Sequence, residues 1–117
     1  MRILSLTGFL LFLLMSCKSN STATQQDNSV LQDLYEVFKE GEISECMLDG
    51  EMYYVAAWNA YDAGSEIYDS KGNKVGVCYY STNQVHDLCD KLVNCEVVYC
   101  VENNIWGETP VNKYDLK

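Results

Sequence analysis

The stretch "ISECMLDGEMYYVAAW", residues 43–58, decides the fold of this chain. Two runs rich in apolar and aromatic residues flank the dipeptide Asp49-Gly50. This dipeptide indicates a tight hairpin turn, because both central residues of such a turn need a positive φ. A two-residue loop would place Leu48 opposite Glu51. The sequence therefore predicts an antiparallel β-hairpin here.

The segments on either side of this hairpin carry their own patterns. In "SVLQDLYEVFKEG" the apolar residues recur at helical spacing and Gly41 supplies a stop, which predicts a helix over Val30–Glu40. Ser29 and Gln32 have the spacing of a capping box at its start. On the other side, "SEIYD" and "KVGVCYY" predict a second hairpin, joined by "SKGN", in which Gly72 and Asn73 can take left-handed conformations.

The C-terminal third predicts a second short helix and one more strand. Apolar residues return at helical spacing in "NQVHDLCDKL", with Asn83 as its cap, and "CEVVYCV" alternates as a strand does. The remaining "ENNIWGETPVNKYDLK" is expected to be an irregular tail. Together these elements predict a small single α+β domain with a mostly antiparallel sheet of two hairpins plus a C-terminal strand.

The N-terminus has the organisation of an export signal. Arg2 precedes the apolar run "ILSLTGFLLFLLM", which is too short to span a bilayer and is typical of a cleaved signal peptide. The run ends in "LMSC", and this sequence resembles the lipobox of bacterial lipoproteins: an aliphatic residue, a variable one, a small one and a cysteine. Met15 departs from the small or β-branched residue usual at its position. An ordinary secretory signal followed by a coincidental cysteine is the alternative.

The resemblance implies an anchored protein. Residues 1–16 would be removed, Cys17 would receive diacylglycerol and a further acyl chain such as palmitate, and two or more chains hold a protein stably on a bilayer. Residues 17–29, polar and without aromatic residues, would then be a flexible tether for a single domain over residues 30–117. An aspartate directly after the lipidated cysteine resembles an inner-membrane retention signal. This chain has Lys18 there, which favours the outer membrane of a bacterial envelope.

Five cysteines remain after Cys17, and an exported protein meets an oxidising compartment in which disulfides persist. Two bridges and one free thiol are the simplest arrangement, but sequence alone does not select the pairing. We expect a long-range bridge from Cys46 and choose Cys100 as the free thiol. The candidates are Cys46, Cys78, Cys89, Cys95 and Cys100. The motifs "I..C", "DG", "YY" and "YD..GN..G.C" are similar to those of small cysteine-containing envelope lipoproteins of unknown function.

Composition narrows the function classes. Without residues 1–16 the chain has seven lysines and seventeen acidic residues, a formal net charge of −10, which disfavours nucleic acid and favours a cationic partner or simple solubility. No G-x-S-x-G, C-x-x-C or paired metal-knuckle motif is present, so the sequence does not indicate an enzyme or a cofactor. His86 with Cys89, Cys95 and Cys100 forms a distant alternative, a site for zinc or copper(I).

The aromatic residues suggest binding instead. The chain has nine tyrosines and two tryptophans, with dense patches in "MYYVAAWNAY", "CYY" and "NIWGETPVNKY". Both residue types are common at recognition surfaces. Tyr53, Tyr54 and Trp106 are the contact candidates, although Trp106 could instead pack the tail onto the domain. We therefore expect a non-enzymatic binding or accessory module that recruits envelope components. The alternative is an inhibitor or immunity-type protein for a cationic envelope enzyme such as a lysozyme or protease.

Overall fold

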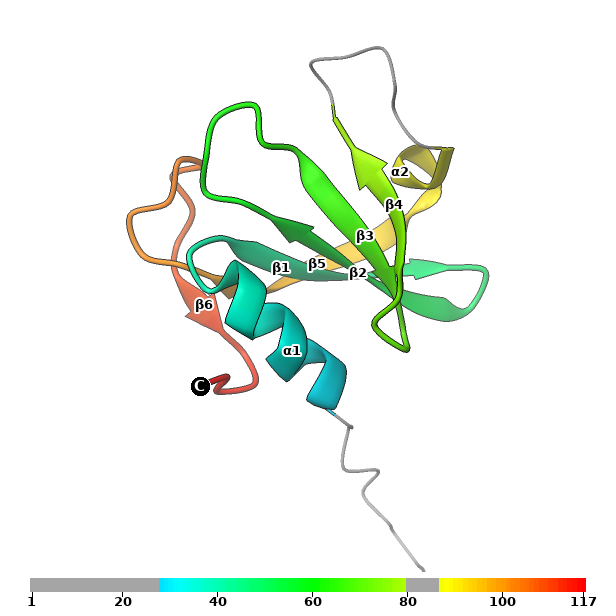
Figure 1. Cartoon of the computed structure of the whole chain (residues 1–117), viewed down its shortest axis with the longest axis horizontal. Coiled ribbons are helices and arrows are strands. Elements are labelled where there is room, and N and C mark those ends of the chain that lie inside the picture. Colours follow the sequence, from blue (N-terminus) through cyan, green and yellow to red (C-terminus); the bar gives the residue numbers. More distant parts are fainter. Residues whose placement is uncertain (1–27, 80–86) are drawn as a thin grey trace, which may run out of the picture.

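The computed structural model describes residues 28–79 and 87–117, which form one α+β domain (Figure 1). Six strands make a single sheet in the order β4-β3-β2-β1-β5-β6, and every neighbouring pair is antiparallel. The elements are α1 (Ser29–Phe38), β1 (Glu42–Leu48), β2 (Glu51–Ala57), β3 (Ser65–Asp69), β4 (Lys74–Cys78), α2 (Asp87–Lys91), β5 (Val93–Cys100) and β6 (Val111–Asn112). The predicted class, with an N-terminal helix, an antiparallel sheet, a second short helix and two disulfides, is confirmed.

The first hairpin has the predicted register. Leu48 pairs with Glu51, and the ladder continues to Glu42 opposite Ala57. The φ angles of Asp49 and Gly50 are 50° and 79°, as a tight primed turn requires. In the second hairpin Gly72 has a φ of 87°, whereas Asn73 does not have a positive φ.

Helix α1 lies across one face of the sheet and builds the main core with it (Figure 1). Its residues Leu31, Leu34 and Phe38 are almost fully buried, as expected for the apolar stripe of an amphipathic helix. Strands β1, β2 and β5 supply the opposing side chains, which include Ile43, Tyr54, Ala56, Val98 and Tyr99. The turn into β1 passes close to β2, because a Cβ on Gly41 would lie 2.0 Å from the carbonyl oxygen of Ala57. Glycine is therefore required at this position.

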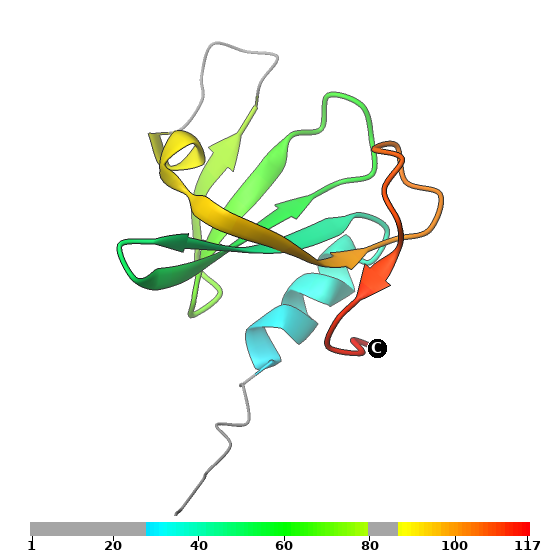
Figure 2. The ribbon, with the colours of Figure 1, turned by 180° about the vertical axis from the view of Figure 1, so that it is seen from behind.

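The other face of the sheet carries both disulfides, with β5 and α2 in front in Figure 2. Cys46 on β1 is bonded to Cys95 on β5, and Cys78 at the end of β4 is bonded to Cys89 on α2. The ladder between β1 and β5 shifts register beside the first bridge, where Asn94 has a φ of 53°. The four bonded cysteines are among the residues that line a cavity of about 190 Å³. Covalent bonds thus brace the face that α1 does not cover.

Two expectations about local structure need correction. Asn28 occupies the N-cap of α1 without a side-chain hydrogen bond, and Ser29 is already helical, so the capping box is wrong. The side chain of Gln32 instead bonds to the backbone of Lys117, which ties the C-terminus to α1. The tail is not wholly irregular, because Val111–Asn112 pairs with β5 as β6. Among the described residues, no helix has the length and apolar character needed to cross a bilayer.

Candidate functional site

Two loops that are far apart in sequence meet at one end of the sheet (Figure 1). One, residues 58–64, joins β2 to β3, and the other, residues 101–110, joins β5 to β6. The backbone N–H of Ile105 donates to the Asn59 side-chain oxygen at 2.8 Å. This bond holds the second loop against the first. We call the two segments the paired loops.

Each of the paired loops has an internal reason for its shape. In the second, the Asn104 amide nitrogen donates to the carbonyl oxygens of Val101 and Glu108, and its oxygen accepts from the Glu108 N–H, all at 2.9 Å. In the first, Gly64 has a φ of 67°, and a Cβ there would lie 2.6 Å from the carbonyl oxygen of Cys78. The second loop is consequently held by its own hydrogen bonds, and Gly64 lets the first loop pass close to the end of β4.

The paired loops line an open pocket of about 300 Å³. Trp58, Tyr61 and Trp106 stand around it and remain 40%, 83% and 37% exposed, so large aromatic surfaces face solvent at one place. Small side chains and one aliphatic residue complete most of the lining: Ala57, Ala60, Ala63, Gly64, Ser65 and Ile105. Pockets dominated by aromatic and apolar surface with a few polar groups are typical ligand sites. We call this the aromatic pocket.

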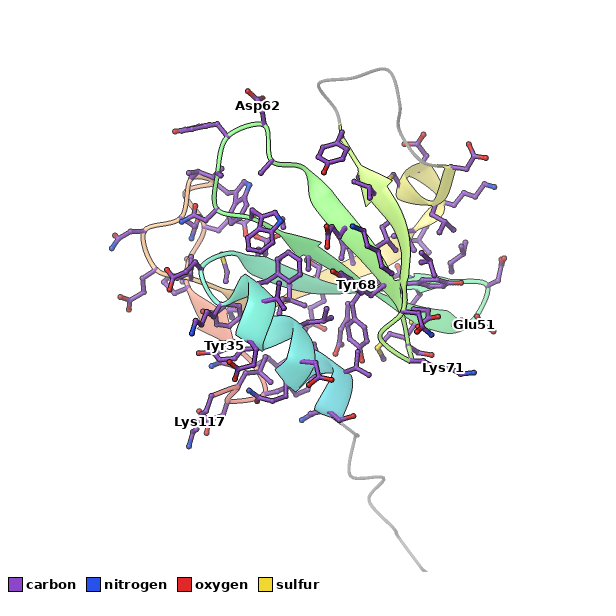
Figure 3. The ribbon with its side chains drawn as sticks, viewed as in Figure 1. Tyr35, Glu51, Asp62, Tyr68, Lys71 and Lys117 are labelled. Carbon is purple, nitrogen blue, oxygen red and sulfur yellow. A yellow bond between two sulfur atoms is a disulfide. The ribbon has the colours of Figure 1, made fainter. Side chains whose placement is uncertain are left out.

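One carboxylate and one core residue complete this pocket. Asp62 belongs to the lining and lies at the outer end of its loop, where Figure 3 labels it. Beneath Trp58 lies the ring of Phe38, with the two ring centroids 4.5 Å apart. Because Phe38 is fully buried, it supports Trp58 from the core. The pocket therefore combines a Trp58 ring supported from the core, two further aromatic side chains and a carboxylate.

The sequence candidates for binding have different positions in the structure. Trp106 lines the aromatic pocket and is also partly packed, so it combines the two roles that the sequence left open. Tyr53 is half-buried on β2. Tyr54 is only 4% exposed within the core under α1, so its assignment as a contact residue is wrong. Sequence reasoning did not single out Trp58 and Tyr61, although both lie in the dense patch "MYYVAAWNAY".

The cysteine and histidine candidates do not form the metal site considered from the sequence. Cys89 and Cys95 belong to separate disulfides, and Cys100 lies elsewhere as a buried free thiol. The prediction of a metal site formed by these thiolates is therefore wrong. The expected long-range bridge from Cys46 is present. His86 and the lipidation candidate Cys17 both lie outside the described residues.

A different group of side chains lies where the second of the paired loops leaves β5. The thiol of Cys100 and the carboxyl groups of Glu42 and Glu108 come within 4.8 Å of one another. Burial, reinforced by the neighbouring Glu108 carboxyl, raises the pKa of Glu42 to about 7. Burial and the same two carboxylates raise the pKa of the Cys100 thiol to about 11. Negative charge is thus disfavoured at this position unless a positive group accompanies it.

No family model, curated protein or solved structure matches this chain. The exposed rings of the aromatic pocket and the strongly negative net charge are the features of the chain itself that bear on its function.

Proposed function

We propose that this chain is a lipid-anchored, non-enzymatic binding module of a bacterial envelope that holds a cationic protein partner at its aromatic pocket. The observation that carries this proposal is the gathering of Trp58, Tyr61 and Trp106 around one pocket between two loops fixed to each other. Aromatic side chains offer large, rigid contact area and dominate the energetics of many protein interfaces. A binding role accounts for leaving so much ring surface exposed.

Charge favours a basic partner over other occupants. The chain has a formal net charge of −10 without its first sixteen residues, and Asp62 lies in the pocket lining. Lysine and arginine side chains bind favourably over aromatic faces, with tryptophan the strongest acceptor, and a nearby carboxylate adds to this attraction. A basic surface would also be steered toward the acidic module before contact. A cationic envelope enzyme, such as a lysozyme or a protease, is one partner of this kind, and capture of its basic surface would make the chain an inhibitor.

Replacing Trp106 by alanine is expected to weaken binding of a basic hydrolase by at least about tenfold, because the substitution removes a central aromatic contact. The measurement is calorimetric titration of the full chain, in detergent, with lysozymes and basic proteases as the probes. Wild-type affinity should also fall as sodium chloride is raised from about 50 to about 500 mM, since salt screens exposed charges.

The matched control is Val93→Ala, which removes a side chain that is 53% exposed on β5, away from the paired loops. This variant should bind as the wild type does. If no basic protein binds saturably, or if binding is indifferent both to salt and to Trp106→Ala, the proposal fails. Saturable binding of soluble envelope glycan, reduced by Trp106→Ala, would instead favour the accessory role.

The anchor is tested separately from the pocket. We expect the intact mass of protein purified from membranes to correspond to cleavage before Cys17 plus three acyl chains. Cys17→Ala should then appear in the soluble fraction, because its only proposed attachment is gone. An unmodified Cys17 in the membrane-purified protein would refute the anchor. It would not affect the binding proposal, which the calorimetric titration tests separately.

A further inference from the structure

We propose that Glu42, Cys100 and Glu108 form a zinc site that joins the second of the paired loops to the sheet. The three residues come from different segments: Glu42 from β1, Cys100 from the end of β5, and Glu108 from the loop between β5 and β6. Glu42 and Cys100 are direct partners in the antiparallel ladder, so their side chains leave the same face of the sheet. We call these residues the Glu-Cys-Glu site.

The donor atoms suit zinc in kind and in spacing. Zinc accepts cysteine sulfur at about 2.3 Å and carboxylate oxygen at about 2.0–2.2 Å, so tetrahedral coordination sets donor atoms roughly 3.5 Å apart. The three donors here already lie within 4.8 Å of one another. Glu108 is exposed on its loop and can close the remaining distance, whereas Cys100 is 2% exposed and fixed in the sheet. A water molecule would take the fourth position.

An unpaired oxygen at the centre of this group points to a missing positive ligand. The Oε2 atom of Glu42 is shut off from solvent and accepts no hydrogen bond. A carboxylate oxygen in that position is costly unless a proton or a cation reaches it. The ion pairs found among residues 28–79 and 87–117 are Lys74–Glu66, Lys113–Glu96 and Lys117–Asp115, and none of them includes this site.

A proton shared between the two carboxyl groups is the competing occupant. It would satisfy Oε2 of Glu42, and the thiol of Cys100 would remain a hydrogen-bond donor to the Glu42 carboxyl group. Zinc binds both carboxylates and the sulfur together. The proton shared by the carboxyl groups and the proton of the Cys100 S–H group both pass to the buffer, and the carboxylate oxygens and the sulfur donate electron pairs to the ion. No atom changes its oxidation state when zinc replaces these protons. The mixed sulfur and oxygen donor set favours zinc over magnesium or calcium, which prefer oxygen alone.

The test is titration of the full chain with zinc and, separately, with cadmium, under anaerobic conditions that keep Cys100 reduced. We expect one zinc ion per chain by calorimetry and an ultraviolet thiolate-to-cadmium charge-transfer band. Glu108→Gln should weaken both by at least about tenfold, because it removes one ligand from an exposed position without disturbing the core. Cys100→Ser should abolish the charge-transfer band.

Glu102→Gln is the matched control, since it removes the same charge from an exposed position on the same loop but outside the site. It should bind zinc as the wild type does. Equal losses in Glu102→Gln and Glu108→Gln would indicate diffuse attraction to acidic surface and would overturn the proposal. Absence of saturable zinc binding, or a cadmium complex without the thiolate band, would overturn it as well. Because these readouts need no partner protein, their failure is independent of the aromatic pocket.

Discussion

Removal of the Cys46–Cys95 bridge by the double substitution Cys46→Ala/Cys95→Ala is expected to lower the free energy of unfolding by about 4 kcal/mol. The bridge closes a sequence separation of 49 residues, and a longer closed loop restricts the unfolded chain more. A domain of this size has a total stability of roughly 5–15 kcal/mol, so the loss is a large share of it. Urea unfolding, followed by tryptophan fluorescence, measures the difference.

The second bridge provides the matched comparison. Cys78 and Cys89 are separated by 11 residues, so Cys78→Ala/Cys89→Ala should cost somewhat less, about 3 kcal/mol. Both pairs line the same cavity, which makes the loss of packing similar in the two variants. A larger loss from the short bridge than from the long one would contradict this account of how the sheet is stabilised.

The second large effect is expected from Phe38→Ala, with a loss of about 3–5 kcal/mol in the free energy of unfolding. Phe38 is fully buried and contacts Trp58 on one side and Tyr68 on the other, with ring centroids 4.5 and 6.2 Å apart. Truncation leaves a cavity under α1 and withdraws the ring that supports Trp58. Partner binding should therefore weaken even under conditions in which the variant is folded.

Val37→Ala is the control for this prediction, because Val37 lies on the same helix and is 53% exposed. Exposed truncations of this kind change stability by about 0.5 kcal/mol or less. Urea unfolding gives the stability of both variants, and the calorimetric titration described above gives their partner affinity. A cost below about 1 kcal/mol for Phe38→Ala would contradict the predicted loss of stability. Unchanged partner affinity in the folded variant would show that Phe38 does not support the aromatic pocket.

The local parts of the fold were predictable because their causes are local. The turn at Asp49-Gly50 needs only two residues with positive φ, and the register of β1 and β2 follows from it. Pairing between β1 and β5 was not predictable in the same way. Ile43 pairs with Tyr99 and Ser44 with Val97, so Val98 is an extra residue that lets both Val98 and Tyr99 reach the core. No short sequence pattern predicts a bulge of this kind.

The candidate sites were also predictable only in part, because they depend on contacts between residues far apart in sequence. The density of aromatic residues indicated a recognition surface, but which rings share a pocket depends on the bond from Ile105 to Asn59, between residues 46 positions apart. The Glu-Cys-Glu site likewise depends on the β1–β5 pairing, which places Glu42 opposite Cys100. Tyr54 was misassigned because adjacent strand residues point to opposite faces, and the sequence did not show which face α1 would cover.

The two edges of the sheet bear on self-association. At one edge β6 has two residues, and at the other β4 has five, begins with the exposed Lys74 and ends at the bridge to α2. Long, flat, uncharged edge strands recruit further strands and lead to aggregation, whereas short edges, edge lysines and adjoining helices oppose it. The proposed lipid anchor would concentrate the chain on a membrane surface, where it would meet its own copies continually. The short edges of this sheet would oppose strand pairing between copies at such a surface.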